Sequence, residues 1–208
     1  MSIEVWMAFA IAATILVVIP GPTIILVISQ AIAYGRRAVV PLVCGVVLGD
    51  FTAMSLSLVG LGAILAASAR FFFVLKWIGA IYLIYLGIKH WRSHSEGGKI
   101  SFATAGASNR ALFKSAYVVT ALNPKGIVFF VAFLPQFVSS SDHAAPQLLI
   151  LGATFLWLAA INATLYAVFA GYLRETVQNS RARRWFDRCG GSALIGAGVF
   201  TAAIQRSS

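Results

Sequence analysis

The stretch IEVWMAFAIAATILVVIPGPTIILVISQAIAY, residues 3–34, decides the fold of this chain. It carries one charged residue, Glu4, and is long enough to cross the ~30 Å hydrocarbon core of a bilayer at ~1.5 Å per residue. No basic segment precedes the apolar run, and apolar character resumes after Pro20-Gly21-Pro22, which distinguishes the stretch from a removable signal peptide. It therefore predicts a membrane-spanning helix that is interrupted at its prolines.

The rest of the chain has the same character. Of its 208 residues, 60% are hydrophobic and 11% are charged, and the mean hydropathy is +0.87. Soluble domains average roughly 45–50% apolar and about 25% charged residues, so the composition excludes a water-soluble globular protein. The net charge of +10 does not indicate nucleic-acid binding, because the basic residues concentrate in short connections, where they set the orientation of membrane helices.

Six apolar runs bounded by polar clusters predict six transmembrane helices in an all-α, polytopic membrane protein. The predicted spans are Ile3–Tyr34, Ala38–Ala67, Phe71–Ile88, Phe113–Val138, Gln147–Leu173 and Asp187–Ile204. A polar connection rich in glycine and serine, Trp91–Arg110, separates the third span from the fourth. We therefore divide the chain into a first three-helix half (residues 1–92), a cytoplasmic linker (93–110) and a second three-helix half (111–208).

The distribution of lysine and arginine predicts the orientation of these spans. Twelve of these residues lie in the first, third and fifth connections, whereas Arg70 and Arg206 lie on the opposite side. Because basic residues accumulate on the cytoplasmic side of membrane proteins, the odd-numbered connections are predicted to be cytoplasmic. Both termini are then predicted to lie on the outer side of the membrane.

Each half has three spans, so two related halves must insert in opposite directions and form an inverted repeat. The opening helix of each half is broken by proline, at Pro20–Pro22 and at Asn123–Pro124. A proline inside a helix removes a hydrogen-bond donor, and lipid tolerates the freed backbone groups only where protein or a water-filled cavity satisfies them. Paired breaks of this kind indicate a transporter's binding site, with a packing kink as the alternative.

Pro22, Asp50, Lys125 and Asn162 lie at one predicted depth. Pro22, Asp50 and Lys125 are each twelve residues from the cytoplasmic edge of the span, and Asn162 is twelve residues from Arg174, just beyond that edge. That separation corresponds to ~18 Å, near the middle of the bilayer. Unusual positions from four spans in one layer predict a substrate cavity. The half-helix that begins near Pro22 and Thr23 would offer free N–H groups and a positive dipole end to an anionic group such as a carboxylate.

Asp50 is the most informative single residue. A charge in the middle of the membrane costs at least ~2.5–3.5 kcal/mol, so a functional role is the first interpretation. The carboxylate could bind a substrate ammonium group or take up and release a coupling proton. The alternative is a structural ion pair, with Lys125 as the natural partner and Lys76 as the second choice. Lys76, next to Trp77, could instead extend toward the outer membrane interface.

Other polar and small residues leave alternatives open. Asn123 and Asn162 could hydrogen-bond a substrate or bridge helices. Gly45 and Gly49 form a face for close helix contact, either within the fold or between the subunits of a homodimer. The two cysteines support neither a disulfide nor a metal site, and no catalytic, phosphate-binding or dinucleotide-binding motif occurs. We therefore expect no enzymatic activity, no cofactor and no metal.

Four stretches carry a resemblance to a known family. They are IPGPTIILVISQAIAYGRRA (19–38), GVVLGD (45–50), LKWIGAIYLIYLG (75–87) and NPKGIVFFVAFLPQF (123–137). In this order and spacing the chain resembles the LysE/RhtB amino-acid exporters over nearly its whole length. The PGP, GD and NPK motifs of that family fall on Pro20–Pro22, Gly49–Asp50 and Asn123–Lys125.

The resemblance implies efflux of amino acids or homoserine-like compounds from the bacterial cytoplasm, driven by the proton-motive force. The Pro-Gly-Pro-Thr form is similar to the homoserine/threonine branch of the family. We therefore expect a secondary active exporter of small neutral amino acids such as threonine, homoserine or leucine, working by proton antiport. An exporter of lysine or arginine and a passive small-solute channel are the alternatives. The expected partners are the amino acid, protons and membrane lipid.

Overall fold

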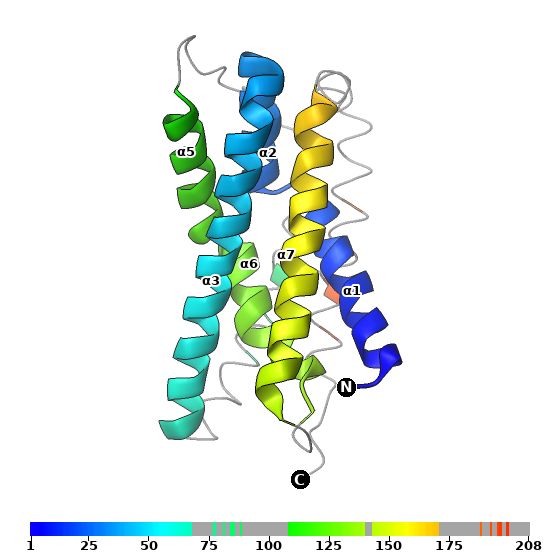
Figure 1. Ribbon diagram of the computed structural model, residues 1–208. Coiled ribbons are helices and arrows are strands. Elements are labelled where there is room, and N and C mark those ends of the chain that lie inside the picture. The colour runs from blue at the N-terminus through cyan, green and yellow to red at the C-terminus, as the bar shows by residue number, and fades with distance from the viewer. Residues whose placement is uncertain are drawn as a thin grey trace.

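The computed structural model describes residues 1–67, 108–139 and 143–170, with isolated residues at positions 77, 81, 84, 85, 88, 188, 192, 195, 196 and 199. Most of the predicted third and sixth spans and of the linker 93–110 lies outside the described residues. The same holds for Lys76 and for the last residues of the predicted fifth span. Within the described part every regular element is a helix (Figure 1), as expected from the composition.

The described helices cover most of the predicted first, second, fourth and fifth spans. Their bounds are α1 Ile3–Val18, α2 Pro22–Tyr34, the 3₁₀ turn η1 Gly35–Ala38, α3 Val39–Ala67, α5 Asn109–Ala121, α6 Pro124–Val128, the π-helical η2 Phe129–Phe133, the 3₁₀ turn η3 Leu134–Phe137, and α7 Ala144–Val168. Two described stretches are long and apolar enough to cross a membrane, Pro22–Gly60 and Ala144–Val168. A third is added if the pair Asn109–Ala121 and Pro124–Phe137, bent by 43°, counts as one span.

Both predicted breaks are present. The first helix stops at Val18 and helical structure resumes at Pro22, which is the first residue of α2. In the second half, α5 ends at Ala121 and α6 begins at Pro124. Proline is favoured at the first helical position because its missing N–H would have no partner there. The prolines therefore end one helix and start the next in both places.

The π-helical and 3₁₀ turns after α6 were not expected from the sequence. They surround Pro135, which lies at the start of η3. Proline cannot donate to the carbonyl four residues before it, so a regular α-helix cannot continue through this position. The backbone changes its hydrogen-bonding pattern instead, and the spans of both halves contain irregular segments.

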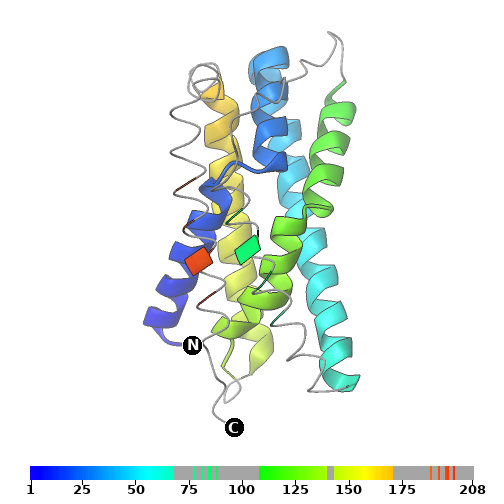
Figure 2. The same ribbon diagram turned by 180° about the vertical axis from the view of Figure 1, so that it is seen from behind.

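The two broken helices run in opposite directions along the bundle (Figures 1 and 2). The chain passes from the N-terminus through α1 to α2 toward one end, returns along α3, and passes from α5 through α6 toward the end where α1 begins. This arrangement is what two oppositely inserted halves require. The complete six-span inverted repeat stays a prediction, because most of the third and sixth spans lies outside the described residues.

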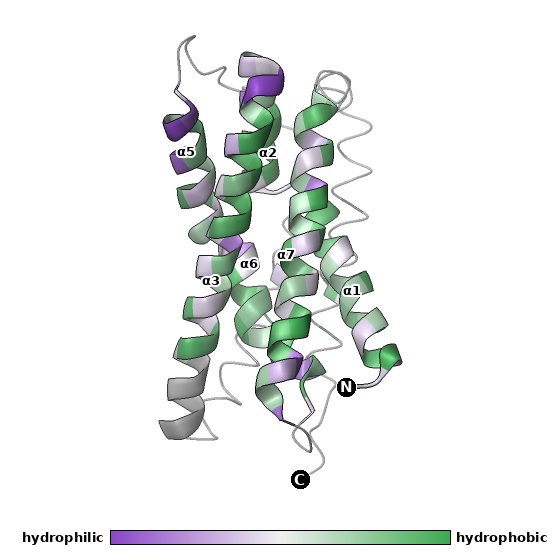
Figure 3. Ribbon diagram, viewed as in Figure 1, coloured by the Kyte–Doolittle hydropathy of each residue, from purple (hydrophilic) through white to green (hydrophobic). Residues whose placement is uncertain are grey.

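The basic residues of the described connections lie at one end of the bundle. Arg36 and Arg37 are in η1, and Arg110 and Lys114 are in the first turns of α5. Figure 3 shows hydrophilic residues at both places, at the end opposite the N-terminus. These four basic residues therefore share one end of the described bundle, and which side of the membrane that end faces stays a prediction.

Two buried apolar clusters lie on either side of the helix breaks. One consists of residues from α1, the middle of α3, η2, η3 and the first part of α7. It contains the aromatic side chains Phe9, Phe129, Phe130, Phe133, Phe137 and Phe155. The other belongs to α2, the start of α3, α5 and the second half of α7, and it consists largely of aliphatic side chains and alanines. The buried polar residues Thr23, Thr120, Asn123 and Asn162 lie at the helix breaks, near both clusters.

The Gly45 and Gly49 face is used within the fold. A Cβ atom added at Gly45 would lie 2.6 Å from the carbonyl oxygen of Phe113. One added at Gly49 would lie 2.8 Å from the carbonyl oxygen of Tyr117 and 2.8 Å from Cβ of Thr120. These glycines let the backbones of α3 and α5 approach closely, as small residues do in membrane helices.

We expect Gly49→Ala to destabilise the protein by about 1–3 kcal/mol, because the added methyl group meets backbone that cannot move aside cheaply. The measurement is thermal unfolding of the purified protein in detergent. Gly60→Ala is the matched control, since nothing lies within 4 Å of a Cβ atom there. Equal melting temperatures for Gly49→Ala and the unaltered protein would contradict this account of the α3–α5 contact.

Candidate functional site

The end of α1 leaves backbone carbonyl groups without their usual partners. A helical carbonyl accepts from the N–H four residues later, and Pro20 and Pro22 cannot donate to the carbonyls of Leu16 and Val18. The last carbonyls of a helix also carry the negative end of its dipole. This end of α1 therefore needs hydrogen-bond donors from elsewhere, and a cationic donor suits it best.

Lys125 supplies that cation. Its Nζ atom donates to the carbonyl oxygens of Leu16 and Ile19, each at 2.9 Å. A Cβ atom added at Gly21 would lie 3.4 Å from the same Nζ atom, so the glycine of the break leaves room for the lysine. The ammonium group of Lys125 thus caps α1, although the residue itself belongs to α6 in the other half of the chain.

Two donors from α7 complete the cap. Asn162 Nδ2 donates to the carbonyl oxygen of Val17 at 2.9 Å, and the hydroxyl group of Tyr166 donates to that of Val18 at 2.8 Å. Sequence reasoning named Asn162 but missed Tyr166. Residues four apart lie on the same face of a helix, so the spacing of Asn162 and Tyr166 on α7 was the available signal.

The start of α2 is joined to the second break by side chains. The hydroxyl oxygen of Thr23 accepts from Asn123 Nδ2 at 3.2 Å and from the hydroxyl group of Thr120 at 3.3 Å. Asn123 also caps α6, because its Oδ1 atom accepts from the backbone N–H of Lys125 at 3.1 Å. The amide of Asn123 therefore bridges the two breaks, and Thr120 is a member of the site that sequence reasoning missed.

The N-terminal end of α2 has no side-chain cap. The two residues after Pro22 are Thr23 and Ile24, and both line an open cavity. Backbone N–H groups in the first turn of a helix have no partner within the helix and carry the positive end of its dipole. The break therefore presents this positive end to the cavity and keeps the negative end of α1 covered.

The cavity volume is about 40 Å³, which holds a few water molecules and is well below the ~300–1,000 Å³ typical of small-molecule sites. An amino acid therefore fits only after the surrounding helices move apart. The cavity lies between the helix breaks and is partly open to the surroundings. The lining residues are Leu16, Val17, Thr23, Ile24, Val46, Asp50, Thr120, Asn123, Lys125, Gly126, Phe155, Ala159 and Asn162. Polar side chains from α2, α3, α5, α6 and α7, and from Asn123 between α5 and α6, therefore meet apolar walls in one space.

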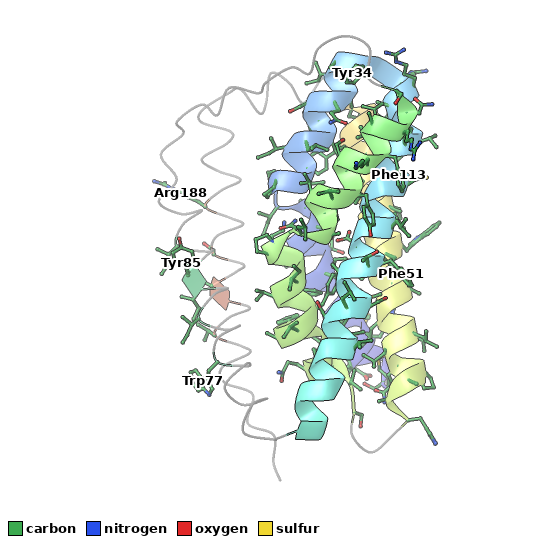
Figure 4. All side chains as sticks on the ribbon, turned by 90° about the vertical axis from the view of Figure 1, so that its left-hand side faces the viewer. Tyr34, Phe51, Trp77, Tyr85, Phe113 and Arg188 are labelled. Carbon is green, nitrogen blue, oxygen red and sulfur yellow. The ribbon has the colours of Figure 1, made fainter. Side chains whose placement is uncertain are left out.

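Asp50 reaches this cavity from α3. Its neighbour Phe51 is 49% exposed and projects from the outer side of the helix (Figure 4), so the two side chains face different surroundings. Among the described residues, the Asp50 carboxylate makes no hydrogen bond and no ion pair within 4 Å. It interacts electrostatically with Lys125 at longer range. Asp50 is thus an acidic group in the cavity wall that is available to a ligand.

The structure brings five of the sequence-derived site residues into one cavity wall: Thr23, Asp50, Asn123, Lys125 and Asn162. The other four described candidates, Pro20, Gly21, Pro22 and Pro124, form the adjoining helix breaks. Lys76 lies outside the described residues, so its role stays a prediction. The amides of Asn123 and Asn162 bridge helices, which is one of the two roles considered for them.

Comparison with known proteins agrees with this picture. A family model described as LysE type translocator matches residues 14–204. A homoserine/homoserine lactone efflux protein of Salmonella typhimurium is 32% identical over 209 residues that cover the whole of both chains. An uncharacterized membrane protein of Vibrio cholerae is 33% identical over 207 residues, which are 99% of this chain and all of that protein. No solved structure matches significantly.

Proposed function

Since the chain belongs to the LysE type translocator family and is therefore a membrane transporter and not an enzyme, we propose that it exports small neutral amino acids by proton antiport. The observation that carries the proposal is the cavity between the two helix breaks. One side of it holds the free carboxylate of Asp50, and another holds the uncapped N-terminal end of α2.

These two groups suit the two ends of a zwitterion. The substrate's ammonium group binds the Asp50 carboxylate, and its carboxylate binds at the N–H groups and dipole of α2 beside Thr23. Lys125 is held by the carbonyls of α1, so its role is to support the break and to balance the charge of Asp50. The apolar wall, which includes Val46, Phe155 and Ala159, receives the substrate's side chain.

The charge of the cavity favours neutral over basic substrates. Its described lining has one acidic side chain, Asp50, and one basic side chain, Lys125. A lysine or arginine substrate carries a second positive charge that would require a second buried carboxylate, because an unpaired charge is costly away from water. The Salmonella relatives are named for homoserine and its lactone, which are also without a charged side chain.

Export follows from alternating access to this cavity. We place the basic end of the bundle in the cytoplasm of a bacterial cell, so that substrate enters past the aliphatic cluster and leaves past the aromatic cluster. A proton taken up by Asp50 from outside neutralises the carboxylate and releases the ammonium group. Return of the protonated site to the cytoplasm and loss of the proton there complete one antiport cycle, with one half moving against the other.

Transport by the purified protein in proteoliposomes tests this function. The vesicles are given an imposed proton gradient and a panel of homoserine, threonine, leucine, lysine and arginine. We expect movement of neutral amino acids against their gradient, with the basic ones moving at least about tenfold more slowly, and loss of uphill movement when a protonophore collapses the gradient. A flux that ignores the gradient would identify a passive channel, and faster movement of lysine or arginine would identify a basic exporter. Movement of none of the five would refute the proposal.

A further inference from the structure

Different structural constraints explain why glycine occupies particular positions in the described part of the chain. Gly35 has a φ angle of +66°, which other residues rarely adopt. Gly45 and Gly49 admit the backbone of α5, and Gly152 leaves room for a methionine side chain of α3 at 2.9 Å. Gly126 fits none of these explanations, because its φ angle is not positive and an added Cβ atom would meet nothing closer than 3.7 Å.

The space beside Gly126 belongs to the cavity. Gly126 is buried in α6 and lines the cavity next to Lys125. An added Cβ atom would lie 3.9 Å from Oδ1 of Asp50 and 3.7 Å from Cε2 of Phe130, both ordinary van der Waals distances. A methyl group at this position would therefore fit without displacing its neighbours, and it would lie directly against the free carboxylate.

We propose that Gly126 sets the size of substrate that the Asp50 end of the cavity accepts. This inference rests on the proposed function, in which Asp50 binds the ammonium group of an amino acid. The volume beside Oδ1 is then shared by that ammonium group and by the carbon atom that bears it. A side chain at position 126 occupies part of that volume and forces the substrate away from the carboxylate.

The surroundings of Gly126 imply that a side chain at this position would lower transport according to its size. Phe130 is fully buried, so the aromatic ring behind the added methyl group cannot turn away into open space. The helix α6 is anchored by Asn123 at its first turn, which fixes the direction in which a side chain at position 126 points. A larger side chain must therefore extend into the cavity, and the loss should grow with the bulk of both the side chain and the substrate.

The test compares Gly126→Ala and Gly126→Val with the unaltered protein in the same proteoliposome assay. The readout is the ratio of the transport rate of the largest neutral amino acid that the unaltered protein moves to that of the smallest. We expect this ratio to fall by about tenfold or more in Gly126→Ala, which is the discrimination that one methyl group typically gives in a fitted pocket, and further in Gly126→Val. Melting temperatures are measured alongside and should stay close to that of the unaltered protein.

Two matched variants separate size selection from general damage. Gly60→Ala adds the same methyl group where nothing lies within 4 Å and should leave the ratio unchanged. Gly49→Ala adds it at a packed contact and should lower all rates together through lost stability. An unchanged ratio in both position-126 variants, or an equal loss for every substrate, would overturn the inference. Absence of transport by the unaltered protein would instead refute the proposed function. The measurement on the unaltered protein therefore tests the proposed function separately from the role of Gly126.

Discussion

Replacing Asp50 by asparagine is expected to abolish proton-driven export while the protein still inserts into the membrane. The amide has nearly the same shape as the carboxylate, so the packing of α3 is retained. It cannot carry the proton, and it binds an ammonium group without the charge. A hydrogen bond to a charged group contributes about 1.5–3 kcal/mol, which corresponds to roughly 10–150-fold in substrate affinity.

The measurement for Asp50→Asn has two arms. The first is uptake into vesicles against a substrate gradient, driven by an imposed pH difference. The second is exchange of labelled for unlabelled substrate without any gradient, which needs binding but no proton movement. Residual exchange together with complete loss of uphill uptake would assign Asp50 to proton coupling. Loss of both exchange and uphill uptake would show that Asp50 is also needed for substrate binding.

Glu4→Gln is the control for this substitution, because it removes an exposed acid at the start of α1, far from the cavity. Glu4→Gln should show the same rates of uphill uptake and of substrate exchange as the unaltered protein. Uphill export by Asp50→Asn at the unaltered rate would contradict a role of Asp50 in coupling. A large fall in its melting temperature would favour the structural role that the sequence also allowed.

The second large effect is expected from Lys125→Met, which replaces the four-carbon stem of lysine by an unbranched side chain of similar length and removes the ammonium group. Two carbonyls of α1, those of Leu16 and Ile19, lose their donor, and Asp50 loses the opposite charge that faces it. Each hydrogen bond from a charged donor contributes about 1.5–3 kcal/mol, so we expect a loss of about 3 kcal/mol or more in unfolding free energy. We also expect transport to fall below detection, because the two half-helices are no longer held in place.

Thermal unfolding and vesicle transport check this expectation together. Lys125→Arg keeps a cationic donor and should retain more stability than Lys125→Met, although its planar group fits the space beside Gly21 less well. Lys114→Met is the control, since Lys114 is exposed at the basic end of the bundle and its loss should cost well under 1 kcal/mol. Normal stability and transport in Lys125→Met would show that the cap of α1 has no role.

Much of this molecule could be predicted from local features of the sequence. The length and apolarity of the runs determined that the chain is a helical membrane protein, because both properties are independent of which helices are neighbours. The prolines determined where α1 and α5 end, because a missing N–H interrupts any helix. Counting residues along the spans placed Asp50, Lys125 and Asn162 at one depth, since the rise of a helix is constant.

The tertiary structure alone decided which groups meet within that layer. The sequence left a structural ion pair between Asp50 and Lys125 as the alternative to a functional role of Asp50. The structure directs the ammonium group of Lys125 to the carbonyl end of α1 and leaves the carboxylate of Asp50 facing the cavity. It also directs Gly49 to α5 within the same chain. The physical reason is that depth depends only on the rise along one helix, whereas a contact depends on how two helices are rotated and placed against each other, which no single segment encodes.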